Sequence, residues 1–436
     1  MSGLRYYSSR DEARAHGVDF ETAMLRGLAP DGGLYLPERL PTVGDDWRGA
    51  GGGPAGIAGR LLTELSGLER EQLVEIFRDA LSFDMPVVKI SGERYLLELF
   101  HGPTAAFKDV GARTLARLMD AALARRSERA TVLVATSGDT GSAVADAFSG
   151  MANVSVALLY PRGKVSPVQE RQLIAKRPGV TAFAVEGNFD DCQRLVKGAF
   201  EDPALKGLGL STANSINVGR LLPQIVYYFW AVERLALDHG VERAVQVVVP
   251  SGNLGNLTAA VFATRMGLEV AGLSAAHNAN DYFVRFLAGG AQPFTFPASV
   301  STMSNAMDVG APSNFERLFA LAGSGLRDSL TSQTVDDAAT ADRMKRTYEE
   351  DGYLVCPHTA VALEALERLR AAGAVPRSLP GLVLATAHPS KFPEAVLSAV
   401  GVTPEQHRGL AALDQAGSAV TGLEPRQEAL REALLA

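Results

Sequence analysis

The sequence predicts an α/β protein in which two parallel-sheet lobes follow a helical N-terminal region. Short β-branched runs, each followed by a glycine-rich loop and a helical pattern, recur in two separate stretches of the chain, and the first part of the chain lacks them. Continuous apolar strands that alternate with helices are typical of parallel sheets covered on both faces. The 436 residues are enough for two or three domains with cores of their own.

The N-terminal region, residues 1–85, is expected to be a helical domain. Amphipathic helical patterns occupy residues 20–28 and 69–83, with Gly/Pro-rich joints between them. Gly51-x-Gly53-x-x-Gly56 formally matches a dinucleotide-binding fingerprint, but it follows Asp45-Asp46-Trp47-Arg48, which does not have the character of the buried strand that the fingerprint requires. We interpret it as a turn that leads into a helix.

The two lobes are expected within residues 86–402. The clearest expected strands are residues 131–135, 154–160, 180–185, 245–249 and 382–386. The clearest expected helices are residues 142–148, 190–200 and a segment that ends at Arg265. A ligand should bind in a cleft at the carboxyl ends of such strands. The tail, residues 403–436, is expected to be helical and to pack on the outside.

Composition excludes several classes of function. No apolar run reaches membrane-spanning length, and the first residues lack the apolar core of a signal peptide, so we expect a cytoplasmic protein without a membrane partner. The formal net charge of −7 comes without a basic stripe, which argues against a nucleic-acid partner. Cys192 and Cys356 have no neighbouring ligand residues, so neither a metal site nor a disulfide is expected.

Lys108 is the most informative residue. Thr104 is expected to be the N-cap of a helix, which places Lys108 in its first turn. The positive end of the helix dipole and the apolar neighbours Phe107 and Leu115 would both lower the pKa of the lysine. An uncharged amine is what imine chemistry with a carbonyl requires. The alternative is a surface lysine that extends along a helix flank.

Two glycine-rich loops between a strand and a helix could bind anions. In residues 251–256, backbone N–H groups at a helix start could hold a phosphate dianion, or the loop could be a glycine turn without a ligand. In residues 136–141, the hydroxyls of Thr136, Ser137 and Thr140 suit a carboxylate, or they could cap the helix that follows. No Gly-Lys-Ser/Thr follows either loop, so ATP hydrolysis is not supported.

Two further segments carry polar groups near the expected cleft. Thr386 ends a strand, where its hydroxyl could face the cleft, and the neighbouring His388 and Lys391 are more often structural than catalytic at such a position. Residues 211–220 are rich in polar donors and precede an apolar aromatic helix. They could line a polar pocket or form a capped loop.

Taken together, these segments resemble the threonine synthase family, pyridoxal-phosphate enzymes of fold type II, also called the tryptophan-synthase-β-like fold. The resemblance extends over nearly the whole chain and is greatest to members that carry a helical N-terminal domain. It rests on the ordered set of residues 32–37, 101–109, 136–141, 160–167, 251–256, 304–308 and 385–392.

The resemblance implies pyridoxal 5'-phosphate as the cofactor, bound covalently by Lys108, with Thr386 at the pyridine nitrogen. A neutral hydroxyl there favours the protonated ring only weakly, so it makes a milder electron sink than an aspartate would. Leu254 stands where many relatives have phenylalanine, and backbone donation should survive that change. The residues implied to hold the cofactor phosphate are Gly252, Asn253, Leu254, Gly255 and Asn256.

The implied reaction converts O-phospho-L-homoserine and water into L-threonine and phosphate, the last step of threonine biosynthesis. We hypothesise that Thr136, Ser137 and Thr140 receive the substrate carboxylate. The candidates for its phosphate are Lys164, Asn217 and Arg220. Two alternatives remain open: a serine/threonine dehydratase-type lyase with the same cofactor, and a catalytically silent homologue that binds a phosphorylated small molecule or a partner protein.

Overall fold

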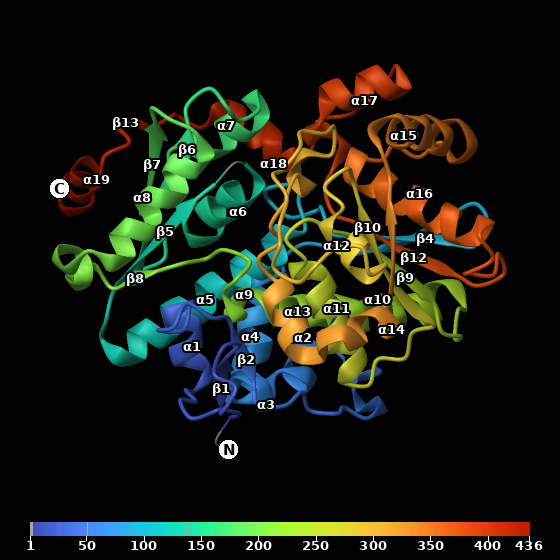
Figure 1. The fold of residues 1–436 in the computed structure, drawn as a ribbon, viewed down its shortest axis with the longest axis horizontal. Helices are drawn as coiled ribbons and strands as arrows, with labels where there is room; N and C mark the ends of the chain where they lie inside the picture. The colour runs from blue at the N-terminus through green and yellow to red at the C-terminus, as the bar shows by residue number, and fades with distance from the viewer. Residues whose placement is uncertain (1–2, 50, 137) are drawn as a thin grey trace.

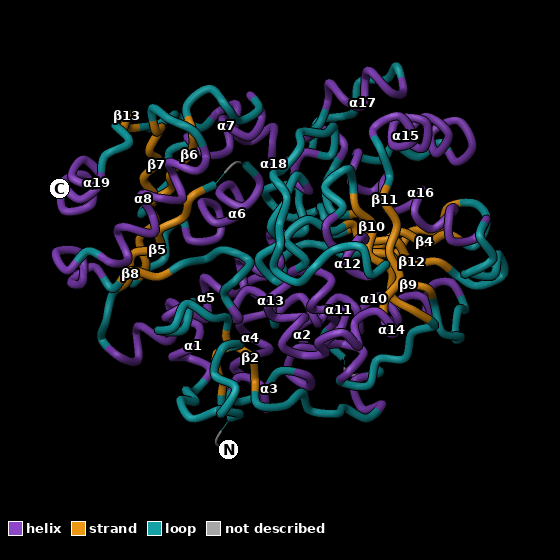
Figure 2. The backbone as a smooth tube through the Cα atoms, viewed as in Figure 1, coloured by secondary structure: helices purple, strands orange, loops and turns teal. Residues whose placement is uncertain are grey.

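The computed structural model describes residues 3–49, 51–136 and 138–436, and it has one parallel-type sheet in each of two lobes (Figures 1 and 2). The predicted α/β class is therefore confirmed. The sheet of the smaller lobe has five strands, all parallel to their neighbours. In spatial order they are β13 (Thr421–Leu423), β7 (Val180–Val185), β6 (Val154–Pro161), β5 (Ala130–Ala135) and β8 (Leu210–Ser211).

The sheet of the larger lobe has six strands, of which five are parallel; the first in sequence pairs with the second as an antiparallel hairpin. In spatial order they are β11 (Leu330–Thr334), β10 (Gly272–His277), β9 (Gln246–Pro250), β12 (Gly381–Ala385), β4 (Arg94–Glu98) and β3 (Val87–Ile90). The chain thus leaves this sheet after β4, builds most of the smaller lobe, and returns at β9. The sequence did not predict β3, β4, β10 or β11.

Helices cover the larger sheet on both faces, as expected for buried parallel strands. Along β9, Val247 and Val249 belong to a core shared with α10 (Pro223–His239) and α11 (Gly255–Arg265), whereas Val248 belongs to a second core with α16 (Pro357–Ala371). The other helices of this lobe are α9 (Val218–Leu221), α12 (Tyr282–Leu287), α13 (Phe315–Ala322), α14 (Leu326–Ser329), α15 (Asp337–Asp351) and α17 (Pro393–Val400).

The smaller lobe is covered by helices that include α6 (Asp139–Phe148), α7 (Pro167–Ile174) and α8 (Phe189–Glu201). The helix α5 (Lys108–Arg126) leads from the larger lobe into the smaller one and packs against α6. Its apolar residues Val110, Leu115 and Leu118 are buried. None of the described helices is long and apolar enough to cross a membrane.

The N-terminal region contains α1 (Phe20–Arg26), α2 (Gly53–Leu61), α3 (Thr63–Ser66) and α4 (Arg70–Ala80), at the bottom of Figure 1. It also contains a small antiparallel sheet of β1 (Tyr6–Ser8) and β2 (Tyr35–Pro37), so it is not wholly helical. Residues 51, 52 and 53 are glycines with positive φ, and α2 begins at Gly53. The interpretation of this glycine motif as a turn into a helix is confirmed.

The tail differs from the expectation in one respect. It contains α18 (Arg408–Ala411) and α19 (Gln427–Leu435), but between them β13 extends the smaller sheet beside β7, with Thr421 opposite Phe183. The chain ends on the far side of the smaller lobe, on the left in Figure 1. Short 3-10 helices are η1 (Asp45–Trp47), η2 (Pro203–Leu208), η3 (Asn305–Met307), η4 (Gly323–Gly325), η5 (Pro389–Lys391) and η6 (Ala412–Gln415).

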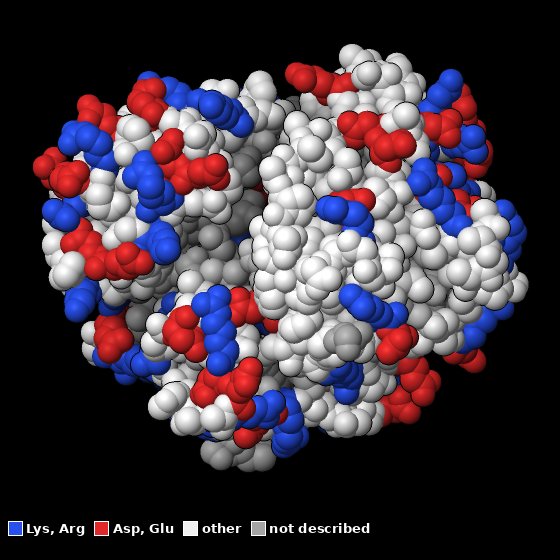
Figure 3. All heavy atoms as spheres, in the orientation of Figure 1, with Lys and Arg blue, Asp and Glu red and all other residues white. Residues whose placement is uncertain are grey.

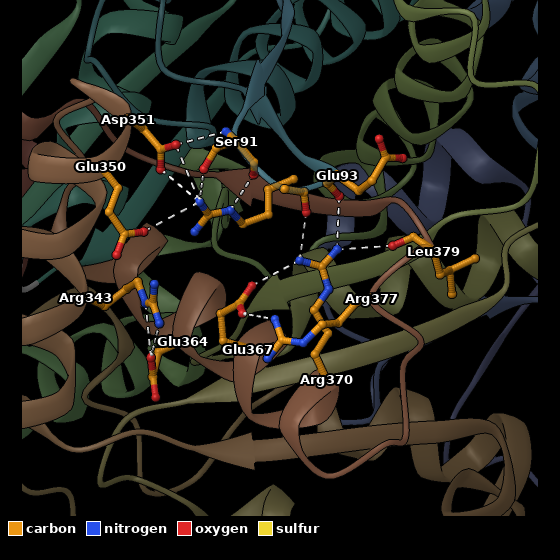
Figure 4. Close-up of polar contacts among 12 residues, drawn as sticks. Ser91, Glu93, Arg343, Glu350, Asp351, Glu364, Glu367, Arg370, Arg377 and Leu379 are labelled. Atoms are coloured by element: carbon orange, nitrogen blue, oxygen red, sulfur yellow. Dashed lines mark hydrogen bonds and ion pairs between the residues drawn. The ribbon is translucent and has the colours of Figure 1, made fainter.

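Two arginines fasten the β3–β4 hairpin to helices that come much later in the chain (Figure 4). Arg94 reaches Asp351 at the end of α15, with 3.1 Å between Nη2 and Oδ2. Arg370 of α16 donates to the backbone oxygens of Gly92 and Glu93 at 3.2 and 3.1 Å. These contacts hold the start of β4, and the far end of β4 leads toward Lys108.

Candidate active site

Lys108 lies at the first position of α5, where the backbone ties this helix to the segment that follows β12. The Phe107 N–H donates to the Thr386 carbonyl oxygen at 2.8 Å, and Ala106 pairs with Ala387 in an isolated bridge. The Lys108 nitrogen lies 5.0 Å from the centre of the Phe107 ring. Lys108 and Thr386, 278 positions apart in the sequence, are therefore neighbours by backbone geometry.

The expected N-cap role of Thr104 is wrong. The N-cap position of α5 belongs to Phe107, and Thr104 binds the carboxylate of Asp109 through its backbone N–H (2.8 Å) and its hydroxyl (2.5 Å). The physical reason is the tight turn at 105–106, where Ala105 has a φ of 56° and delays the start of the helix. Lys108 still falls in the first turn, as predicted.

A cavity between the two lobes brings most of the predicted site residues together. In Figure 3 the surface is hollowed between the smaller lobe, on the left, and the rest of the molecule. The predicted residues that line the cavity are Lys108, Thr140, Arg220, Gly252, Asn253, Leu254, Gly255, Asn256 and Thr386. Residues not predicted also line it, among them Asp139, Ser215, Gln224, Met307 and His358.

The charges around the cavity act on Lys108. Burial lowers the pKa of Lys108 to about 8, Asp139 opposes this shift, and the cations Arg220 and Lys391 add to it. Burial alone would raise the pKa of Asp139, but Lys391 and Lys108 lower it well below its usual value. Asp139 is therefore ionised, with one oxygen 3.9 Å from the Lys108 nitrogen. Lys108 is therefore an amine of lowered pKa with the ionised carboxylate of Asp139 nearby.

The loop between β9 and α11 is shaped as an anion cradle. Leu254, at the N-cap of α11, has a left-handed φ of 61°, and the first amides of a helix have no partner within it. A Cβ at Gly252 would lie 3.0 Å from Met307 Cα and 3.3 Å from the Ala306 oxygen, so only glycine fits without displacing that backbone. The amides of the loop can therefore turn toward a phosphate in the cavity.

Asn256 completes this cradle with a side-chain donor. Its Oδ1 accepts from the hydroxyls of Tyr227 at 2.6 Å and Tyr228 at 2.5 Å, which fixes the orientation of the amide group. Its Nδ2 is buried and has no hydrogen-bond partner among the described residues. An unsatisfied buried N–H is costly, so this group is suited to an acceptor supplied by a ligand.

Several predicted substrate residues do not reach the cavity lining. Thr136 is buried, and its hydroxyl accepts from the N–H groups of Gly138 (3.1 Å) and Gly141 (2.9 Å), which is the capping alternative. Asn217 is also buried and caps α9, because its side chain binds the backbone of residues 24, 212 and 219. Lys164 is exposed on the surface of the smaller lobe. Ser137 lies outside the described residues.

Three residues at or near the cavity were not predicted to belong to the active site. The sequence assigns no active-site role to Asp139 and favours a structural role for Lys391; the two form a buried ion pair at 3.1 Å. No sequence pattern marks His358. Its Nε2 accepts from the Ala306 N–H at 3.1 Å, its Nδ1 has no partner in the described chain, and burial lowers its pKa to about 4. Only the tertiary fold brings these residues to Lys108.

Comparison with known proteins decides the family. Residues 87–386 match the family described as pyridoxal-phosphate dependent enzyme, and the ends match two threonine synthase families, the N terminus over residues 5–51 and the C-terminal part over residues 359–434. Threonine synthase from Escherichia coli is 41% identical over 425 residues, which cover 94% of each chain. The chain belongs to the threonine synthase family. Its members are pyridoxal-phosphate-dependent lyases that act on a phosphate ester.

Solved structures agree with this assignment. The crystal structure of PLP-bound threonine synthase from Brucella melitensis has a TM-score of 0.91 and 38% identity, with 99% of each chain covered. A processed threonine deaminase from Solanum lycopersicum has a TM-score of 0.55 at 14% identity and covers 76% of this chain, so it shares the fold alone. The alternative of a dehydratase therefore has only fold-level support.

The cavity fits pyridoxal phosphate, the cofactor of this family. The cradle that a Cβ at Gly252 would disturb and the unpartnered Nδ2 of Asn256 suit a phosphate group. Lys108 suits the aldehyde, because its lowered pKa makes the free amine accessible near neutral pH. Arg220, a cation in the cavity lining, also favours an anionic group there.

Proposed function

We propose that this chain converts O-phospho-L-homoserine and water into L-threonine and inorganic phosphate, with Lys108 as the catalytic residue. One observation carries the proposal: a lysine of lowered pKa shares a single cavity with the glycine cradle and with Thr386. Bound pyridoxal phosphate supplies an electron-withdrawing ring that stabilises negative charge on the substrate carbons. The chain supplies the binding groups and the proton transfers.

Three parts of the site hold the cofactor in this proposal. Lys108 binds it covalently, and residues 252–256 bind its phosphate through backbone N–H groups and the Asn256 amide. Thr386 donates or accepts a hydrogen bond at the ring nitrogen through its hydroxyl. Thr386 is 6% exposed and its carbonyl oxygen is already held by the Phe107 N–H, so its side chain has a fixed starting point.

Lys108 also moves protons. When it is not bonded to the cofactor, the Lys108 nitrogen would be a free amine that could take the proton from Cα. A second proton would have to leave Cβ as the Cγ–O bond to phosphate breaks, and Lys108 could then return a proton at Cγ. The hydroxyl of water would add at Cβ and a proton would return to Cα, while the remaining proton of the water goes to the released phosphate. A base with a pKa of about 8 can both accept and give protons near neutral pH. Asp139, held in its ionised form, stabilises the protonated lysine between these steps.

The two anionic groups of the substrate need separate donors. We assign the substrate carboxylate to Thr140 and the start of α6, because Thr140 lines the cavity whereas Thr136 is occupied within its own loop; Ser137 remains a candidate. We assign the substrate phosphate to Arg220, which also lines the cavity. Its Nη1 donates to the Ala213 oxygen at 2.6 Å, and a guanidinium has five N–H donors in total.

The decisive experiment supplies O-phospho-L-homoserine to the purified holoenzyme and measures threonine and inorganic phosphate. Equal amounts of both are expected. Incubation with L-threonine alone tests the dehydratase alternative, because 2-oxobutanoate would then form. Formation of 2-oxobutanoate without threonine synthesis would overturn the proposal.

A pair of variants tests the phosphate assignment. Arg220→Ala should raise the KM for O-phospho-L-homoserine by about 10-fold or more, since a hydrogen bond to a charged group contributes about 1.5–3 kcal/mol. Lys164→Ala removes an exposed cation of the smaller lobe that lies outside the cavity lining, and its kinetics should match the wild type. An unchanged KM in Arg220→Ala would remove Arg220 from the site.

A further inference from the structure

Lys391 is a buried cation that the mechanism above does not use. It ends η5, just after β12, and its side chain is 0% exposed. Its nitrogen lies 2.8 Å from the Thr104 oxygen, 3.0 Å from Gln172 Oε1 and 3.1 Å from Asp139 Oδ1. An ammonium group has three donors, and here each has an acceptor, one of them charged. This arrangement suits a charged lysine in the interior.

The contacts of Lys391 join the two lobes at the site. Lys391 follows the last strand of the larger sheet, whereas Asp139 begins α6 and Gln172 lies on α7, both in the smaller lobe. Gln169, also on α7, donates to the same oxygen of Asp139 at 3.3 Å. One carboxylate oxygen, Oδ1, is thus held by two side chains, Lys391 and Gln169.

The other oxygen of Asp139 faces the reactive lysine without closing on it. Oδ2 lies 3.9 Å from the Lys108 nitrogen, beyond the 2.7–2.9 Å of a charge-assisted hydrogen bond. Lys391 competes for the same carboxylate and holds it at a shorter distance. A closer pair between Asp139 and Lys108 would stabilise the ammonium form, which has no lone pair for attack.

We propose that Lys391 is a positioning residue of this site: by holding Oδ1 of Asp139 it keeps Oδ2 from forming a tight ion pair with Lys108, so that Lys108 reacts as a free amine. The proposal rests on the proposed role of Lys108 in binding the cofactor. Lys391 acts through Asp139 and lines neither the loop for the cofactor phosphate nor the cavity wall described above. The charged groups around Lys108 that set the balance are Asp109, Asp139, Arg220 and Lys391.

Covalent attachment of the cofactor provides a test that does not depend on turnover. The enzyme is stripped of pyridoxal phosphate and reloaded over a range of pH, and the rate of attachment is followed by the change in visible absorption. Because only the uncharged amine of Lys108 attacks the aldehyde, the midpoint of this pH profile reports the protonation of Lys108. Circular dichroism confirms that each variant is folded.

Two variants on the same ion pair should move the midpoint in opposite directions. Lys391→Gln keeps a hydrogen-bond donor but loses the charge, which allows Asp139 to form a closer ion pair with Lys108. We expect the midpoint to rise by about one pH unit or more. At a pH below the midpoint, this shift makes attachment of the cofactor about tenfold slower. Asp139→Asn removes the anion itself, so the midpoint should fall. In Lys391→Met, which loses donor and charge together, the midpoint should rise as it does in Lys391→Gln.

Opposite shifts separate this role from simple loss of structure. Damage to the lobe contact would affect Lys391→Gln and Asp139→Asn in the same direction, because both break the same ion pair. An unmoved midpoint in Lys391→Gln, or shifts of the same sign in the two variants, would overturn the proposal. A wild-type enzyme that attaches the cofactor but makes no threonine would refute the proposed function alone, and the midpoints would still decide the role of Lys391.

Discussion

Exchange of Asn256 for aspartate isolates the contribution of the cradle to cofactor binding. The wild-type amide is oriented by two tyrosine hydroxyls on Oδ1, which leaves Nδ2 buried and unpartnered among the described residues. Aspartate has nearly the same size and still accepts from Tyr227 and Tyr228. The substitution therefore exchanges one donor for an anionic oxygen and leaves the rest of the local packing in place.

The size of the effect follows from two contributions. A hydrogen bond to a charged group contributes about 1.5–3 kcal/mol, so losing it weakens binding about 10- to 150-fold. An ionised carboxylate about 4 Å from a phosphate charge adds a repulsion of about 4 kcal/mol at an effective dielectric constant of about 20. Together the two contributions amount to a loss of about 10,000-fold or more while the carboxylate is ionised. Because the introduced carboxylate can relieve the repulsion by binding a proton, we expect the loss to exceed about 1,000-fold at pH 8 and to be smaller at pH 6.

The assay compares two ligands on the cofactor-free protein. Pyridoxal phosphate should bind Asn256→Asp far more weakly than it binds the wild type, whereas the affinity for pyridoxal, which lacks the phosphate, should change by less than about threefold. Tyr228→Phe is the matched control: it removes one of the two hydroxyls on Oδ1 but keeps the amide, so the loss should stay below about tenfold. Equal losses for both ligands in Asn256→Asp, or unchanged binding of pyridoxal phosphate, would refute the reasoning.

Three further predictions follow from packing, burial and the Thr386 hydroxyl. Gly252→Ala places a Cβ 3.0 Å from Met307 Cα and should weaken the binding of pyridoxal phosphate about 5- to 150-fold. In Gly255→Ala the nearest atom to the new Cβ lies at 3.4 Å, so the affinity should change less than about threefold. Equal effects of the two variants in a fluorescence titration would contradict this prediction. Thr386→Val should lower kcat about 2- to 15-fold and Thr386→Ser should not, and identical kcat values in both variants would exclude the hydroxyl. Acid should destabilise the protein through its buried histidines. Between about pH 6.5 and 4 these histidines bind protons in the unfolded chain but not in the folded one. The free energy of unfolding should therefore fall by roughly 1–2 kcal/mol per buried histidine when the pH is lowered to about 5. Asp109, whose pKa burial raises to about 6, offsets part of this loss. A Tm that stays constant from pH 7.5 to 5 would contradict the acid prediction. The histidines whose pKa burial lowers to about 4 are His277, His358, His388 and His407.

The strands that the sequence missed show the limits of periodicity. β5, β6, β7 and β9 are continuous apolar runs next to clear turn signals, so they were predictable. β4 contains Arg94 and Glu98, and their charges hide a strand whose five residues are all buried. Only the ion pair of Arg94 with Asp351, and contacts of Glu98 with His101 and Tyr353, make that burial possible.

Local sequence alone determined the chemistry of this protein. Lys108 in the first turn of a helix, the glycine loop at 251–256 and the hydroxyl at 386 are each defined by short segments whose strand, loop and helix order can be read directly. Backbone amides at a helix start and an amine in an apolar turn have these properties wherever the fold places them. This is why the cofactor and the family could be predicted before any contact was known.

Only the tertiary structure decided which side chains act together. Asn217 and Thr136 looked available in sequence, yet their polar atoms are bound by nearby backbone groups. Asp139 and Lys391 looked ordinary, yet they meet 3.1 Å apart beside Lys108 because the chain leaves the larger sheet after β4 and returns to it later. Distances between residues that are hundreds of positions apart depend on how the sheets pack, and no local pattern encodes them.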